Sequence, residues 1–224
     1  MGQANKKKSV QRARSGRAQK RNTAPVLVLI VAVSIALAFV IAIVAGGSDS
    51  NEGASGPDYQ PVTVEGSALP SLEEGQPDTA IGTRAPSISG LSFDGTTVAV
   101  TPGDGKNHMV VFLAHWCPHC NAEIPRLIDW KNQGMVPDGL IVTGISTAVA
   151  NDRPNYPPSR WVKVKGWPWE TMADSENMDA AAAYGVAGYP FFALVDGDGI
   201  VRYRFSGEIE IDQLNQVISE AFAN

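Results

Sequence analysis

The stretch MVVFLAHWCPHC, residues 109–120, contains both cysteines of this 224-residue chain. It begins with an uninterrupted apolar run, which is typical of a β-strand that is buried on both faces of a sheet. Pro118 suits the first position of a helix, and apolar residues recur at helical spacing after it. The stretch therefore predicts a buried strand, a turn that carries Cys117, and a helix that begins at Pro118.

Strand-like and helix-like patterns alternate through the rest of the chain. Further strands are expected at residues 140–146, 191–195 and 200–205, and further helices at residues 158–165, 177–184 and 214–222. The turn residues 196–199, Asp-Gly-Asp-Gly, join the last two strands into a hairpin. Parallel strands joined by helices, followed by an antiparallel pair, predict an α/β fold in which helices flank a central mixed sheet.

The N-terminal part of the chain has the features of a membrane anchor. Residues 26–45 carry no charge and one polar side chain, Ser34, and twenty helical residues span about 30 Å, the thickness of a bilayer core. Residues 1–24 hold eight basic side chains and no acidic one, so the positive-inside rule places this tail in the cytoplasm. We therefore expect a transmembrane helix at residues 25–45; a cleaved signal peptide is the alternative.

Two further segments follow the expected anchor. Residues 46–80 are rich in Gly, Ser, Pro and acidic side chains and poor in large apolar ones, a composition that favours a flexible linker. Within them only Val62-Thr63-Val64 suggests a strand. The globular domain is expected at residues 81–224, a length that allows one core.

The pair Cys117 and Cys120 admits three interpretations. A structural disulfide would close a very short loop and would stabilise the fold weakly. A metal site could use four potential ligands within six residues, namely His115, Cys117, His119 and Cys120. A structural zinc site, however, usually takes its second ligand pair from a distant segment, and the chain has no second CxxC. The third interpretation is redox chemistry.

The position of the pair favours redox chemistry. A cysteine at the start of a helix lies at the positive end of the helix dipole, beside unpaired backbone N–H groups that stabilise its thiolate. The thiolate is the nucleophile that attacks a disulfide. Cys120 lies about one helical turn after Cys117 and can resolve the mixed disulfide. The sequence therefore predicts a thiol–disulfide oxidoreductase, with a tethered metal carrier as the alternative.

Three motifs carry a resemblance to a known family. WCPHC (116–120), CNAEIP (120–125) and VAGYP (186–190) followed by FFALVDGDGIV resemble the thioredoxin superfamily, and more narrowly its membrane-anchored TlpA/ResA-like branch. The resemblance covers about residues 81–224 and implies a thioredoxin-like fold.

The resemblance also implies roles for individual residues. Cys117 would attack the substrate disulfide, and Cys120 would resolve the mixed disulfide. Pro190 corresponds to the family's cis-proline, which faces the cysteines and lets the preceding backbone pair with an extended substrate. Glu123 corresponds to an acidic residue near the cysteines that accepts a proton from Cys120. Thioredoxins proper carry a buried acid in the preceding strand, where this chain has Val111.

Two aromatic residues are expected to contact the substrate. Trp116 is expected to be partly packed and partly a wall of the substrate groove. Tyr189 stands where threonine or a branched apolar residue is commoner in the family. An aromatic ring at this position would close the groove or add a stacking surface.

His119 bears on the direction of electron flow. A hydrogen bond or positive charge from His119 near the Cys117 sulfur would favour the thiolate and hence the reduced form, which makes a stronger oxidant. Pro-His is the dipeptide typical of DsbA-like oxidases. The scaffold instead resembles reductases that serve cytochrome c maturation or keep copper-site thiols reduced. The direction therefore stays open at this point.

The complete hypothesis is a single-pass cell-membrane protein whose thioredoxin-like domain lies outside the cytoplasm. Its expected partners are exported cysteine-containing proteins, a membrane electron-transfer partner that recycles it, and the lipid bilayer through residues 25–45. Nucleic acid is not expected, because residues 25–224 hold ten basic and 23 acidic side chains. No cofactor and no metal are expected.

Overall fold

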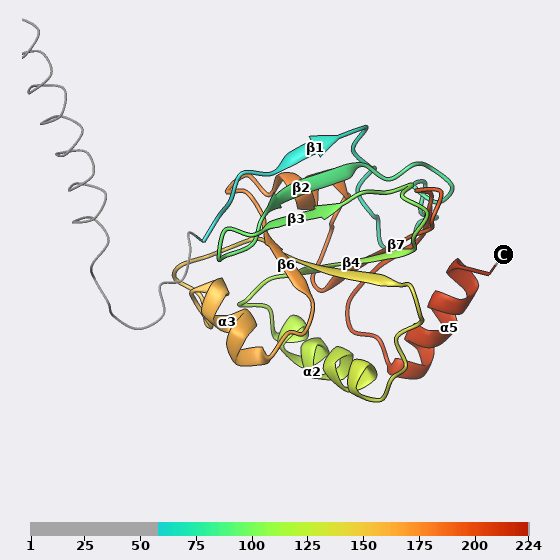
Figure 1. The fold of residues 1–224 in the computed structure, drawn as a ribbon. Helices are drawn as coiled ribbons and strands as arrows, with labels where there is room; N and C mark the ends of the chain where they lie inside the picture. The colour runs from blue at the N-terminus through green and yellow to red at the C-terminus, as the bar shows by residue number, and fades with distance from the viewer. Residues whose placement is uncertain (1–57, 224) are drawn as a thin grey trace, which may run out of the picture. The chain divides into compact units, whose positions relative to one another are not determined.

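A computed structural model describes residues 58–223 of the chain (Figure 1). The elements in chain order are β1 (Thr63–Glu65), β2 (Ser87–Leu91), β3 (Thr97–Val100), β4 (His108–Leu113), α2 (Pro118–Asn132), β5 (Ile141–Ser146), α3 (Pro158–Lys165), β6 (Glu170–Ala173), α4 (Asp179–Ala183), β7 (Phe191–Val195), β8 (Val201–Ser206) and α5 (Ile211–Ala221). The expected tail and transmembrane helix lie outside the described residues. Within residues 58–223, no helix is both long and apolar enough to cross a membrane.

The central sheet has the strand order β6-β5-β4-β7-β8. Strand β4 pairs in parallel with β5, and β5 pairs in parallel with β6. Strand β7 runs antiparallel to both β4 and β8. This mixed sheet confirms the α/β class predicted from the sequence.

Strand β4 separates two apolar cores. Its residues Val110 and Phe112 belong to the core shared with α4 and the small antiparallel sheet β1-β2-β3. The alternate residues Met109, Val111 and Leu113 belong to the core shared with α2 and α5. Figure 1 shows the small sheet on one side of the central sheet and α2 on the other. The apolar run in the sequence is therefore explained by burial on both faces.

The expected linker needs a correction, because residues 58–80 are part of the folded domain. Strand β1 pairs with β2, and Leu69 is buried in the core. The backbone N–H groups of Leu69 and Leu72 donate to the carbonyls of Ala183 (2.9 Å) and Gly185 (3.0 Å). Backbone pairing and one apolar anchor thus hold a segment whose composition is typical of a tether.

Gly185 allows this segment to approach closely. Its φ of +65° lies in the left-handed region, and a Cβ at this position would lie 2.1 Å from the carbonyl oxygen of Pro70. Only glycine satisfies both conditions. Gly185, which directly follows the helix expected at residues 177–184, therefore accommodates the segment that crosses it.

In strand β8, buried and exposed side chains do not simply alternate along the strand. The register shifts between Leu194 and Val195, so Arg202 is an extra residue in β8. Val201 and Arg204 consequently share the buried side, while Tyr203 is exposed. Arg204 forms an ion pair with Asp78, which ties the strand to the segment before residue 80.

Candidate active site

Cys117 lies at the junction of β4 and α2. Its backbone is extended (φ −72°, ψ 123°), and the helix begins at Pro118. The N–H of Cys117 donates to the carbonyl of Ala114 at 3.0 Å, and the Cys117 carbonyl accepts from Asn121 N–H at 3.1 Å. The strand, turn and helix predicted from residues 109–120 are therefore confirmed.

The two cysteines, both free thiols in the structure, differ in accessibility. Cys117 is 5% exposed and Cys120 is 0% exposed. The Sγ of Cys117 donates to the Tyr189 carbonyl oxygen at 3.4 Å, and the Sγ of Cys120 accepts from Ala114 N–H at 3.5 Å. Burial raises the pKa of the Cys120 thiol far above its usual range, despite that hydrogen bond. An incoming disulfide therefore meets Cys117 first, with Cys120 behind it.

The loop before β7 faces Cys117. The peptide bond between Tyr189 and Pro190 is cis. The rings of Tyr189 and Trp116 meet edge to face, with centroids 6.1 Å apart, and Trp116 Nε1 donates to the Ala148 carbonyl at 2.6 Å. The structure thus brings together the two aromatic residues and the proline that the sequence nominated.

A groove runs beside this loop. It has a volume of about 490 Å³ and is lined by residues 187–189, residues 204–207 and residues 72–76. One wall therefore comes from the segment that was expected to be a linker, and another contains Tyr189. The groove lies next to the backbone that contacts the Cys117 sulfur.

Glu123 is fully buried on the inner face of α2. Its Oε2 pairs with Arg126 and accepts from Ile209 N–H at 3.3 Å, while its Oε1 has no hydrogen-bond partner among the described residues. Burial raises the pKa of this carboxyl, although the Ile209 and Arg126 contacts oppose the shift. The Glu123 charge in turn adds to the raised pKa of Cys120. A carboxyl group with a raised pKa near a buried thiol is suited to proton exchange.

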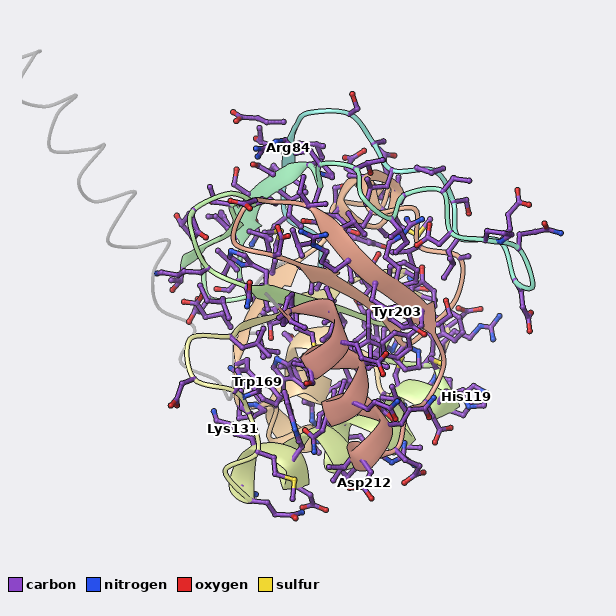
Figure 2. The ribbon with its side chains drawn as sticks, turned by 90° about the vertical axis from the view of Figure 1, so that its right-hand side faces the viewer. Arg84, His119, Lys131, Trp169, Tyr203 and Asp212 are labelled. Atoms are coloured by element: carbon purple, nitrogen blue, oxygen red, sulfur yellow. The ribbon has the colours of Figure 1, made fainter. Side chains whose placement is uncertain are left out.

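His119 lies on the surface, in the first turn of α2. Its side chain is 67% exposed, and Figure 2 shows it at the edge of the molecule. Its Nδ1 is 2.8 Å from Glu208 Oε1. Among the described residues, the hydrogen bond of His119 is with Glu208 and not with the Cys117 sulfur, and the expected influence of His119 on the redox poise stays a prediction.

His115 does not join the cysteines as a metal ligand would. Its Nε2 accepts from Ala150 N–H at 3.1 Å, so its Nδ1 carries the proton that it donates to the Pro154 carbonyl at 2.8 Å. Burial lowers the pKa of His115, which favours this neutral form. Across residues 58–223, no group of three or more His, Cys, Asp or Glu side chains is placed to hold a metal ion.

Sequence reasoning missed Asn121. Its Nδ2 donates to the carbonyls of Cys117 (2.8 Å) and His115 (3.1 Å), and its Oδ1 accepts from Trp161 Nε1 at 3.0 Å. Asn121 thereby ties the cysteine turn to α3. An asparagine in the first turns of a helix gives no sequence signal of such contacts.

These features define a class of protein. A thioredoxin-like mixed sheet carries two thiols at the start of a helix, opposite a cis-proline, and this is the arrangement of a thiol–disulfide oxidoreductase. The Redoxin family model matches residues 80–218, and the chain belongs to that family.

Individual relatives agree with this assignment. The chain is 29% identical over 120 residues to the thiol:disulfide interchange protein HelX of Rhodobacter capsulatus, a match that covers 54% of this chain and 63% of HelX. It is 32% identical over 111 residues to the thiol:disulfide interchange protein DsbE of Escherichia coli K12, covering 47% of this chain and 52% of DsbE. The chain thus spans between half and two thirds of these relatives' lengths. The resemblance to the TlpA/ResA-like branch fits these matches.

A solved structure shows the same fold. The thioredoxin domain of a thiol-disulfide oxidoreductase from Bacteroides vulgatus superposes with a TM-score of 0.51 at 25% sequence identity. The superposition covers 65% of this chain and 99% of that domain. The superposition therefore covers nearly the whole of that solved thioredoxin domain.

Proposed function

We propose that this protein is a membrane-tethered, extracytoplasmic reductant of disulfides in exported proteins. The observation that carries the proposal is the placement of Cys117, whose sulfur lies against the Tyr189 carbonyl before the cis-proline, with Cys120 buried behind it. The sequence supports the topology: residues 1–24 form a cytoplasmic tail, residues 25–45 the anchor, and residues 46–57 the tether to a domain that begins near residue 58.

The reaction consists of two thiol–disulfide exchanges. The Cys117 thiolate attacks one sulfur of a substrate disulfide, forming a mixed disulfide and releasing the first substrate thiolate. Cys120 then loses its proton to Glu123 and attacks Cys117. The second substrate thiolate leaves, and the protein is oxidised to the Cys117–Cys120 disulfide. Two electrons pass to the substrate, and a membrane electron-transfer partner returns them. Trp116, Tyr189 and Pro190 hold the substrate chain in this scheme.

The position of His119 favours reduction as the direction. His119, the residue that would favour an oxidant, is turned toward Glu208 and solvent. The relatives DsbE and HelX, named for thiol:disulfide interchange, and the family resemblance support a role in cytochrome c maturation.

The reduction potential of the full chain in detergent tests the direction. We expect a value near or below about −250 mV after equilibration with a thiol–disulfide couple of matching potential, as for thioredoxin-like reductants. A value near about −120 mV would instead identify an oxidant of exported proteins. Quantification of the dithiol and disulfide forms after acid quenching measures the potential.

Glu123→Gln is expected to slow the attack of Cys120 on the mixed disulfide by about a hundredfold, as for loss of a general base. In the native protein this step should accelerate as the pH rises through the raised pKa of Glu123, because only the carboxylate accepts the proton. The variant should lose that acceleration. Single-turnover kinetics across pH measure it.

Asp129→Asn provides the matched control for Glu123→Gln, since Asp129 is an exposed acid on the same helix. It should keep the native rate and pH profile. An unchanged profile in Glu123→Gln would remove Glu123 from the proposed mechanism.

A further inference from the structure

A chain of charged side chains leads from the buried Glu123 to the exposed His119. Arg126 pairs with Glu123 on one side and lies 3.4 Å from Glu208 Oε2 on the other. The second carboxylate oxygen of Glu208, Oε1, lies 2.8 Å from His119 Nδ1. Glu208 is 89 residues away from His119 in the sequence, so no local pattern reveals the contact.

The direction of the hydrogen bond is fixed by its acceptor. The hydrogen bond from His119, helped by Arg126, lowers the pKa of Glu208, and an ionised carboxylate can only accept. Nδ1 of His119 therefore carries the proton and donates it to Glu208. Among the described residues, Glu208 is the one hydrogen-bond partner that His119 has.

The backbone holds Glu208 in place on both sides. The N–H of Gly207 donates to the Pro190 carbonyl at 2.8 Å, and the N–H of Ile209 donates to Glu123 at 3.3 Å. Glu208 thus lies between two contacts with the active site. Its carboxylate is a fixed acceptor at the edge of the cysteine turn.

We propose that Glu208 is a positioning residue that holds the imidazole of His119 away from the Cys117 sulfur and so keeps the protein reducing. The proposal rests on the proposed function and explains it. A Pro-His dipeptide favours the thiolate when its imidazole donates to the sulfur or adds positive charge beside it. Here the Nδ1–H is directed to a carboxylate, and that carboxylate offsets any positive charge on the ring. The oxidant character of the dipeptide is thereby suppressed.

Glu208→Ala in the full chain tests the proposal. The imidazole would be free to turn toward Cys117, where its N–H or its positive charge stabilises the thiolate and hence the reduced form. We expect the equilibrium with the reference thiol–disulfide couple to shift about tenfold toward the reduced protein, which is about 30 mV for two electrons.

Two further variants make the result specific. Glu210→Ala is the matched control, because Glu210 Oε1 lies 3.2 Å from Arg126 Nη2 and makes no contact with His119 among the described residues; its potential should equal the native one. In a His119→Asn background, Glu208→Ala should have no effect. Circular dichroism verifies that each variant is folded.

The outcomes are distinct. A native potential in Glu208→Ala overturns the proposal, and so does an equal shift in the His119→Asn background, because the effect would then act through Arg126 and Glu123. The reduction potential of the native protein tests the reducing direction. The difference in reduction potential between the native protein and Glu208→Ala tests the role of Glu208, so the proposed direction and the proposed role of Glu208 can fail separately.

Discussion

Replacing Cys120 by serine is expected to leave a protein that reacts once with a disulfide and then stays covalently attached to its substrate. Cys117 can still attack, because it is the more accessible thiol. The buried position behind it would hold a hydroxyl group, which cannot displace the substrate thiolate. Turnover should fall on the order of a thousandfold or more, as when one member of a catalytic unit is removed.

Cys117→Ser is the matched variant, because it removes the attacking sulfur and keeps the resolving one. It should form no adduct, since Cys120 is fully buried and burial raises its pKa. Non-reducing electrophoresis after incubation with a disulfide-containing peptide measures the adduct, and insulin reduction measures turnover. Adducts on the Cys117→Ser variant, or native turnover in Cys120→Ser, would reverse the assigned roles.

The central part of the fold could be predicted because its sequence signals are local. Strand β4 is apolar at nearly every position since it is buried on both faces, and Pro118 marks the start of α2 directly after it. The hairpin of β7 and β8 has turn residues between two apolar runs. Each of these signals lies within about a dozen consecutive residues.

Other parts of the fold depend on contacts that no local pattern encodes. Strand β2 reads SISGL and β6 reads ETMA, and both are short and poor in strong strand formers. Each becomes a strand through its neighbours, β2 between β1 and β3 and β6 beside β5. Residues 58–80 likewise resemble a tether in composition, and besides the pairing of β1 with β2 they are held by partners more than a hundred residues away.

The candidate site likewise combines residues that local sequence signals indicate with contacts that such signals do not encode. The positions of Cys117, Cys120 and Glu123 follow from one helix, and the family resemblance indicated Pro190. The partner of His119 could not be predicted, because Glu208 reaches it from the loop before α5. His115, a candidate metal ligand in the sequence, instead holds the loop of residues 150–154 through both ring nitrogens.

Arg204 is the residue whose loss should most affect stability. Its side chain is 0% exposed, and it pairs with Asp78. Its Nη1 also donates to the carbonyls of Pro70 (2.9 Å) and Tyr184 (2.8 Å). One guanidinium therefore joins β8, the end of α4 and the segment that forms a wall of the groove.

Arg204→Leu is expected to lower the free energy of unfolding by about 3–5 kcal/mol, because it leaves a largely buried carboxylate and two carbonyls without their partner. Proteolysis within residues 66–80 should accelerate as well. Arg202→Leu is the control, since Arg202 is 46% exposed and pairs with Asp196 at the surface; it should cost at most about 1 kcal/mol. Urea denaturation measures both, and equal losses would contradict the assigned importance of Arg204.

The pH dependence of this loss identifies the ion pair as its cause. Burial alone would raise the pKa of Asp78, but the hydrogen bonds and charge of Arg204 and the N–H of Ala80 lower it below its usual value. A lowered pKa stabilises the fold above the unfolded-state pKa of about 3.9, and this contribution is lost as the pH falls through the folded-state pKa. The difference between the native protein and Arg204→Leu should therefore be largest near neutral pH and shrink below about pH 4. A difference that stays constant down to low pH would mean that packing, rather than the pairing of Arg204 with Asp78, holds residues 58–80 on the domain.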